Sequence, residues 1–442
     1  MNTTQFEYTI ETDYIRLTKY IGKEEVVSLP EEIDGLPVRI LGAHCFYENG
    51  GDIRKIVVPK SVRIIEEYAC EFCLSLEELV LSDGVEQLKK NFIVFTAQES
   101  LYIPASVNCI EHIGELNVNL IFSPDNPYYF SDGFGIYHKE SSGITLETTV
   151  SSADMIPVVS YAVKSGTTRI SSDAFFYQEH LKELFLPDSL IQIDSGALSN
   201  SKNQFEQTTG ISTIHLSPSH PVFFLDQTGF YERLSDGTSC LIKYLGRHSH
   251  IDLPETVSII GKGAFSQLPV EKLKIPKSVQ TILPDAFIDC PLSEVYIESL
   301  SLSIYLPGQN HYLLKQVLRG FGQHDQFYDF HYYDELLEED TVNLEKVRMR
   351  LYRLTHPFQL SQKQENYYRT HISKYLDTIL LHFAEEKRLS DLQTLCQLGF
   401  FTKENIDNAI NTLNQPLFAE SLAIIMNYKH AFLGTDDFDF SL

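Results

Sequence analysis

The chain has 442 residues, of which 43% are hydrophobic and 21% charged, and its 60 Asp and Glu outnumber its 35 Lys and Arg to give a formal net charge of -25. This is the composition of a folded protein, and the length exceeds what a single compact core usually holds. The negative charge repels phosphate backbones and anionic lipid surfaces, which argues against nucleic acid and bare membrane as partners.

The N-terminal region is predicted to be a β-hairpin that caps the first repeat, within residues 1–50. Residues 6–10 and 14–18 alternate apolar and polar side chains, as half-buried strands do. Neither an export signal nor the roughly 18 uninterrupted apolar residues of a membrane span is present. We therefore expect no membrane insertion and a cytoplasmic location for the chain as given; a cell-surface location would require a signal that was removed.

A short phrase with the pattern apolar-x-apolar-Pro-x-Ser/Thr-apolar recurs along residues 51–304. Its copies, one of which lacks the proline, lie at 56–62, 79–85, 101–107, 184–190, 251–257 and 273–279. The third position steps from 58 to 81 and 103, and from 253 to 275, which are intervals of 23, 22 and 22 residues. This period is typical of leucine-rich repeats, whose coils stack into a solenoid.

A second phrase, Ile-x-x-x-Ala-Phe, fills the rest of the period at 170–175, 260–265 and 282–287. With these two phrases the chain, over about residues 5–300, resembles the BspA-like leucine-rich-repeat family. The resemblance implies a β-rich solenoid of the α/β superhelix class. It also implies a kinship with bacterial and protozoal surface proteins that bind host or matrix proteins, so an adhesin-like role is an alternative if the chain is exported.

Two insertions are predicted in the solenoid, near residues 123–150 and 217–250. Ser123-Pro124, Phe130 and Tyr137 recur as Ser217-Pro218, Phe224 and Tyr231, a constant shift of 94 residues (217 minus 123). The resemblance identifies both segments as β-hairpins of the kind common in the family.

Residues 305–442 are predicted to be an all-α segment, because apolar residues there recur at intervals of three and four. We expect helices over 344–354, 368–383 and 389–398, another with Thr402 as its N-cap, and a last one starting at Pro416. The acidic run 334–340 is predicted to lie on the surface where solenoid and helices join. Whether the helices are only a cap or a separate partner-binding domain stays open.

Few residues suggest chemistry. Cys70 and Cys73 have the spacing of a redox motif, but they occupy core positions of the repeat, so we interpret them as buried packing residues. The histidine pairs His248 with His250 and His324 with His331 lack a third ligand at suitable spacing. We therefore predict no enzymatic activity, no cofactor and no metal site.

The outer positions of the repeat strands are the candidate partner-binding residues. In each strand the residue between two inward-facing apolar ones lies on the concave sheet surface, and several of these are large and apolar, as interface anchors are. They are Val57, Val80, Tyr102, Phe185, His215, Lys274 and Tyr296. The sequence thus predicts a non-catalytic module that binds a protein or peptide with this sheet. The alternative is a cytoplasmic scaffold or regulator whose helical segment binds the partner.

Overall fold

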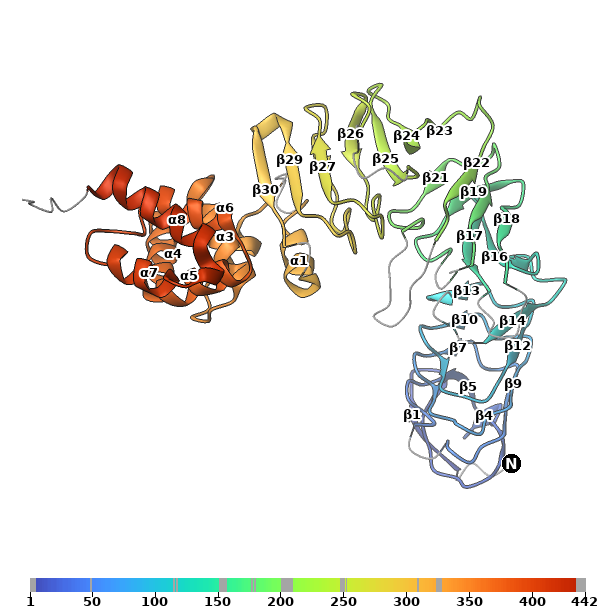
Figure 1. Ribbon diagram of the computed structural model, residues 1–442. Helices are drawn as coiled ribbons and strands as arrows, with labels where there is room; N and C mark the ends of the chain where they lie inside the picture. The colour runs from blue at the N-terminus through green and yellow to red at the C-terminus, as the bar shows by residue number, and fades with distance from the viewer. Residues whose placement is uncertain are drawn as a thin grey trace, which may run out of the picture. The chain divides into compact units, whose positions relative to one another are not determined.

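The structure is a computed structural model that describes residues 5–47, 50–113, 116, 118–150, 157–175, 178, 180–199, 210–246, 251, 253–307, 310–322 and 328–434. His248, His250 and His324 lie outside the described residues. The chain divides into two compact units, Met1–Arg233 and Leu234–Leu442 (Figure 1).

The first unit begins with the predicted hairpin. Strands β1 (Phe6–Ile10) and β2 (Ile15–Tyr20) pair antiparallel, and β2 then pairs in parallel with β5 (Leu36–Leu41). Phe6 and Tyr20 turn inward, and their rings lie 5.2 Å apart. The hairpin therefore supplies the first sheet neighbour of the solenoid and covers its first apolar layer.

Each of the first coils contributes one strand to each of two parallel sheets, which Figure 1 shows on opposite sides of the stack. One sheet contains β5, β7 (Ile64–Ile65), β10 (Gln87–Leu88) and β13 (Cys109–Ile110). The other side carries β3 (Val26–Ser28), β6 (Lys55–Val58) and β9 (Glu78–Leu81), followed by the pair β12 (Ser100–Ile103) and β14 (Asn119–Phe122).

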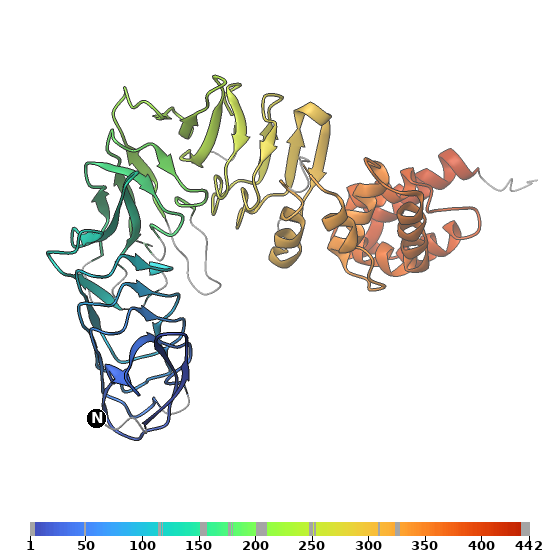
Figure 2. The same cartoon turned by 180° about the vertical axis from the view of Figure 1, so that it is seen from behind.

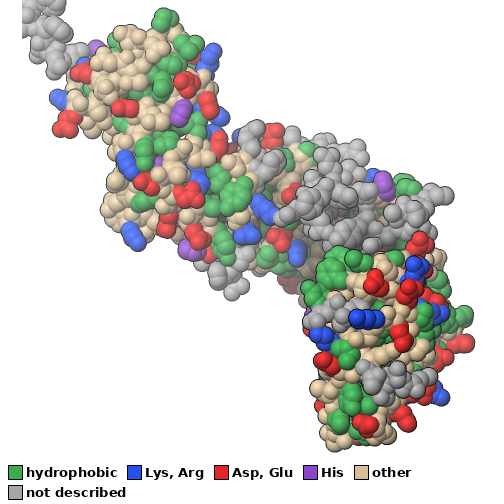
Figure 3. Space-filling model, turned by 90° about the horizontal axis from the view of Figure 1, so that it is seen from below, with side chains coloured by type: hydrophobic (Ala, Val, Ile, Leu, Met, Phe, Trp, Pro, Cys, Tyr) green, Lys and Arg blue, Asp and Glu red, His purple; other side chains and the backbone are tan. Residues whose placement is uncertain are grey.

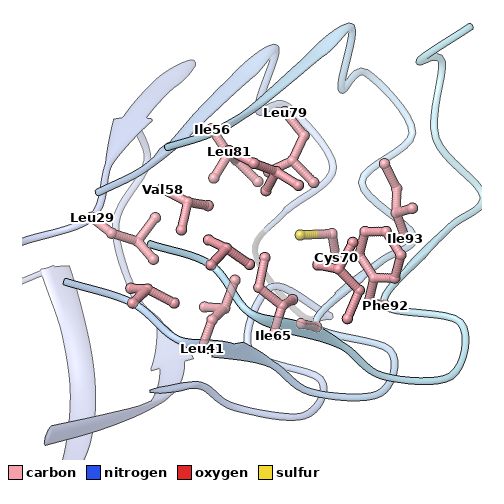
Figure 4. Close-up of a cluster of buried hydrophobic side chains, with 14 of the residues drawn as sticks. Leu29, Leu41, Ile56, Val58, Ile65, Cys70, Leu79, Leu81, Phe92 and Ile93 are labelled. Carbon is pink, nitrogen blue, oxygen red and sulfur yellow. The ribbon is translucent and has the colours of Figure 1, made fainter. Parts of the chain in front are cut away.

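The core of these coils lies between the two sheets. Ile56 and Val58 of β6 point toward Leu41 and Ile65 of the opposite sheet, and all four are buried (Figure 4). Because side chains alternate along a strand, only one residue in two can face this core. The residues between them are left on the outside.

The two predicted insertions are both antiparallel hairpins. The first comprises β15 (Tyr129–Ser131), β16 (Gly135–Glu140) and β17 (Gly143–Thr149), and the second comprises β23 (Phe223–Leu225) and β24 (Gly229–Arg233). Phe130 faces Tyr137 and Phe224 faces Tyr231 in the same register, with ring centroids 5.0 and 5.1 Å apart. The 94-residue shift thus reflects two copies of one hairpin.

The remaining strands of the first unit are β4 (Glu32–Ile33), β8 (Cys70–Glu71), β11 (Ile93–Val94), β18 (Ser160–Ala162), β19 (Thr167–Ile170), β20 (Glu183–Phe185), β21 (Gln192–Ile193) and β22 (Thr213–His215). Strands β18, β20 and β22 form a parallel sheet, as do β17, β19 and β21. The two-strand coil therefore continues beyond the first hairpin.

The second unit starts with the last coils of the solenoid. Its strands are β25 (Ser239–Tyr244), β26 (Val257–Ile260), β27 (Lys272–Ile275), β28 (Thr281–Ile282), β29 (Glu294–Ile297) and β30 (Leu302–Tyr305). Strand β30 pairs antiparallel with β29, whereas β27 and β29 are parallel. The parallel repeat therefore ends at β30.

Eight α-helices follow among the residues that the structure describes, drawn orange to red in Figures 1 and 2. They are α1 (His311–Leu318), α2 (His331–Glu335), α3 (Leu344–Thr355), α4 (Gln362–Lys374), α5 (Leu376–Glu385), α6 (Leu389–Gln397), α7 (Ile406–Leu413) and α8 (Ala419–Tyr428). The single helix expected over 368–383 is instead two, because Tyr375 leaves helical geometry with φ -111° and ψ 18°. Thr402 lies outside α7, which starts after Asn405.

The helical segment covers the end of the solenoid. The rings of Tyr244, Phe265 and Phe287 stack from coil to coil at 5.4 Å, and Phe321, which follows α1, packs on Phe287 at 4.9 Å. On β30, Tyr305 donates a hydrogen bond to Glu345 of α3 at 2.8 Å. These contacts bury the apolar face that an open solenoid end would expose to water.

The acidic run 334–340 departs from the prediction at its first residue. Asp334 on α2 is buried and accepts two hydrogen bonds from Arg353 on α3, at 2.7 and 2.9 Å. The Arg353 guanidinium also lies 4.0 Å from the centroid of the Phe330 ring. A buried carboxylate is stable only when it is paired in this way, so Asp334 joins two helices instead of facing water.

Candidate functional site

The outward face of the strands is built by the same alternation that makes the core. In β6 and β12, Ile56 and Leu101 are fully buried, while their neighbours Val57 and Tyr102 turn to the outside. Lys55 and Glu78 also face outward, in register on β6 and β9, with 2.5 Å between ammonium and carboxylate. The face thus combines apolar side chains with ion pairs.

Six of the seven predicted residues form three register-matched pairs. Val57 faces Val80, Phe185 faces His215, and Lys274 faces Tyr296 as direct neighbours on adjacent parallel strands. Tyr102 belongs to a separate two-stranded sheet, beside Ile121. The first five residues belong to the first unit, and Lys274 and Tyr296 belong to the second.

The exposure of these residues differs. Tyr102 is 51% exposed and Phe185 is 39% exposed, whereas Val57, Val80 and Tyr296 are half-buried. Large aromatic side chains at half exposure carry the apolar area that an interface can bury. Tyr102 and Phe185 are therefore the strongest anchor candidates among the seven.

The polar members of the group are already engaged. The His215 ring stacks on Phe185 at 4.2 Å, and its Nε2 lies 2.7 Å from Oε1 of Glu183. This hydrogen bond lowers the pKa of Glu183. The Lys274 ammonium lies 3.0 Å from the Glu298 carboxylate. These residues form the polar surroundings of the face.

Sequence reasoning missed two exposed apolar residues on this face, Val26 on β3 and Ile121 on β14. Ile121 on β14 is 49% exposed and lies beside Tyr102. Its strand shows the expected alternation, since Leu120 is buried. However, Phe122 follows Ile103 by 19 residues (122 minus 103), so the regular period of 22 to 23 passes over this strand.

A second exposed aromatic row lies at the bends of the coils. Tyr47, Phe72 and Phe95 are 53%, 41% and 60% exposed, and the rings of Phe72 and Phe95 stack at 4.9 Å. Both phenylalanines have a left-handed backbone, with φ of 56° and 55°. This row does not belong to the outward strand positions, so its residues can serve as controls for substitutions on the strands.

The two cysteines considered for redox chemistry are packing residues. Cys70 and Cys73 are buried as predicted, and burial raises the pKa of the Cys73 thiol to about 12. A protonated, buried thiol is a poor nucleophile. Within the described ranges, no group of three His, Cys, Asp or Glu residues could hold a metal ion. No helix in the same ranges is long and apolar enough to span a membrane.

Among the described residues on the face that Figure 3 draws, acidic, basic and apolar side chains are intermixed. Two cavities of about 410 and 400 Å³ are present among the described residues. The smaller is lined by Arg39, Lys60 and Arg63 together with Glu31, Glu32 and Asp83. The larger lies beside β14 and the first hairpin.

Parallel strands stacked coil upon coil, buried Leu and Ile on their inner side and an outward face of mixed character define a leucine-rich-repeat solenoid. Six copies of the BspA type leucine rich repeat region match residues 32–113, 155–219 and 242–307. The chain therefore belongs to the BspA-type leucine-rich-repeat family. Repeats of this family point to a protein-interaction or surface repeat protein.

The solved structures to which this chain is similar include bacterial leucine-rich-repeat proteins. A leucine rich cell surface protein from Faecalibacterium prausnitzii is 17% identical, with a TM-score of 0.36 over 66% of this chain and 92% of that chain. The pneumococcal vaccine antigen PcpA is 15% identical, with a TM-score of 0.31 over 67% and 69% of the two chains. A leucine-rich-repeat protein from T. pallidum is 21% identical, with a TM-score of 0.22 over 48% and 80%. No curated protein matches the sequence.

Proposed function

We propose that this chain is a non-catalytic interaction module that binds a protein or peptide with the outward face of its solenoid strands. The observation that carries the proposal is the exposure of large apolar side chains at strand positions where water favours polar ones. Tyr102 and Ile121 lie side by side at about half exposure, and Phe185 stands on the later sheet with its ring supported by His215. Aromatic side chains held rigidly in this way are the usual anchors of interfaces.

The proposal is tested with the full chain and a displayed peptide library. Peptides selected on the wild-type protein are measured against the double variant Tyr102→Ser/Phe185→Ser and against Phe95→Ser. Phe95 is the matched control, because it is an aromatic residue of similar exposure on the coil bends. Loss of either anchor alone should weaken binding by roughly 30-fold, since a hot-spot residue contributes about 2 kcal/mol, and loss of both should weaken it further.

The control variant should bind like the wild type. Equal affinity for all three proteins would refute the role of the outward face. A loss of affinity confined to Phe95→Ser would mean that the coil bends, and not the strands, bind the peptide. Unchanged far-ultraviolet circular dichroism establishes that the variants fold.

A second candidate function is supported by a separate observation on the helices. Leu417, Met426 and Phe432 are 74%, 52% and 75% exposed at the end of the helical segment. This exposure supports a scaffold or regulator whose helical segment binds the partner. The variant Leu417→Ser/Phe432→Ser distinguishes the two: it should leave binding intact if the strands bind, and abolish binding if the helices do.

A further inference from the structure

The sheet on the outward side of the first unit is interrupted after β14. Strand β14 pairs in parallel with β12, and β18 pairs with β20. Throughout the described ranges, no strand pairs with the other edge of β14. A strand edge of this kind presents unpaired N–H and C=O groups that another chain can use.

The direction of the β14 backbone shows which groups are free. The N–H groups of Asn119 and Ser123 donate to Glu99 and Ile103 carbonyl oxygens at 2.9 Å. Alternate residues of a parallel strand bond to opposite sides, so the N–H and C=O groups of Leu120 and Phe122 point to the other edge. No backbone hydrogen bond of Leu120 or Phe122 toward that edge occurs among the residues described.

A cavity of about 410 Å³ lies along this strand. Its walls are β14 itself, from Asn119 to Phe122, and the first hairpin, which contributes Phe130, Ser131 and Lys139. The volume falls within the usual range for ligand-binding clefts, about 300–1,000 Å³. The free edge thus borders an open space that an added strand can enter.

The charge at this cavity is opposite to that of the chain as a whole. Lys139 is the one charged residue among its lining residues. The ammonium groups of Lys139 and Lys164 lie 5.0 and 5.4 Å from the centroid of the same ring, Phe130. Neither lysine has a carboxylate within ion-pair distance in the described part of the chain. Two such cations favour a ligand that carries a carboxylate.

We propose that the free edge of β14 binds an extended peptide as an added strand, with an acidic side chain of that peptide placed at Lys139 and Lys164. Backbone hydrogen bonds to the Leu120 and Phe122 edge supply the attachment, and the two ammonium groups select the charge. The site adjoins Tyr102, which lies beside Ile121 of β14, but it binds through the backbone edge and the two lysines instead of through exposed apolar side chains. Replacing Tyr102 and Phe185 therefore tests it apart from the outward face.

Ten-residue peptides are selected from a displayed library. The target of the selection is the full chain carrying the double substitution Tyr102→Ser/Phe185→Ser. The selected peptides should carry Asp or Glu. A synthetic parent peptide is compared with its Asn or Gln form and with two N-methylated forms, methylated at even or at odd residues. An added strand bonds through only one set of amides, so one N-methylated form should bind at least tenfold more weakly while the other is affected little.

The protein is varied in parallel. Lys139→Glu/Lys164→Glu should weaken binding at least tenfold, whereas Lys23→Glu, which changes an exposed lysine elsewhere, should not. Absence of any selected peptide, equal binding by both methylated forms, or binding indifferent to the reversal at Lys139 and Lys164 would overturn the proposal. A concentration-dependent dimer in sedimentation, abolished by that reversal, would also overturn it, because a second copy of the chain would then occupy the edge.

Discussion

Ser106 and Ser61 occupy the same position in two copies of the Pro-x-Ser phrase, yet their surroundings differ. The Ser106 hydroxyl accepts a hydrogen bond from Gly84 N–H at 2.9 Å and donates one to the Val85 carbonyl at 2.7 Å. Gly84 can present its N–H because it adopts φ 141°, a conformation that other residues rarely enter. In the coil before Ser61, the position that corresponds to Gly84 is occupied by Glu32. Ser61 therefore lacks the glycine that Ser106 has.

The first prediction compares these two serines. Ser106→Ala leaves a backbone donor and acceptor without their partner, so we expect the free energy of unfolding to fall by about 2 kcal/mol. The buried Ser61 hydroxyl has no hydrogen-bond partner among the described residues, so Ser61→Ala should leave that free energy unchanged or raise it. Urea unfolding of both variants measures the difference. Equal destabilisation by the two substitutions would contradict the account.

The stability of the helical segment should depend on pH through His371. His371 on α4 is buried, and burial together with the positive charge of Arg350 lowers its pKa below 6.5; Lys374 acts in the same direction and Asp340 in the opposite one. As the pH falls through 6.5 the unfolded chain binds a proton that the folded chain does not yet bind. The folded state therefore loses stability, by at most about 1.4 kcal/mol per pH unit, until the lowered pKa is reached.

His371→Gln removes this titration. Unfolding measured at pH 7.5 and 5.5 should show a smaller loss of stability for the variant than for the wild type. An identical loss in both proteins would mean that other groups cause the pH dependence.

At the scale of elements, the ion pair of Asp334 and Arg353 joins α2 to α3, and Tyr368 on α4 donates to the same carboxylate at 3.0 Å. Asp334→Leu leaves Arg353 buried without its charge partner, so we expect a loss of about 3–5 kcal/mol. Lys272→Gln removes an exposed ion pair with Glu294 and should cost less than about 1 kcal/mol. Denaturant unfolding compares the two. A small effect at Asp334, similar to that at Lys272, would be inconsistent with a paired, buried carboxylate.

The elements that could be predicted are those whose local pattern is complete. The repeated phrases predicted β6, β9, β12, β20 and β27 because each carries two inward apolar residues followed by a turn. Strand β14 was missed because it follows β12 by 19 residues (122 minus 103) instead of 22 or 23. Strand β18 keeps the spacing but was missed because Lys164 stands where the phrase has Pro187 one coil later. The break of the long helix at Tyr375 depends on packing within the segment, which periodicity alone does not contain.

The candidate site was predictable only in part for the same reason. Alternation identifies which side chain faces outward, as at Tyr102 and Phe185. It does not determine how much neighbouring side chains cover each residue, as at Val57 and Val80, which are half-buried. The free edge of β14 depends on which strands pair, and that is a property of the assembled coils.

For the molecule as a whole, a solenoid stabilises itself through contacts between neighbouring coils, so the outer side of its strands is available for binding. The net charge of -25 argues against polyanionic partners, and the exclusion of nucleic acid stays a prediction from that charge. The outward strand positions and the coil bends belong to the same coils. The effects of substitutions on binding can therefore be compared between the two surfaces of one protein.

The most direct test of the central claim is photo-crosslinking from single positions of the full chain. A photoreactive phenylalanine analogue replaces Tyr102, Phe185 or Phe95, and a peptide selected on the wild-type protein is added before irradiation. Binding by the outward strand face should give covalent adducts from positions 102 or 185 and none from position 95. Adducts from position 95 alone, or from none of the strand positions, would contradict binding by the outward strand face.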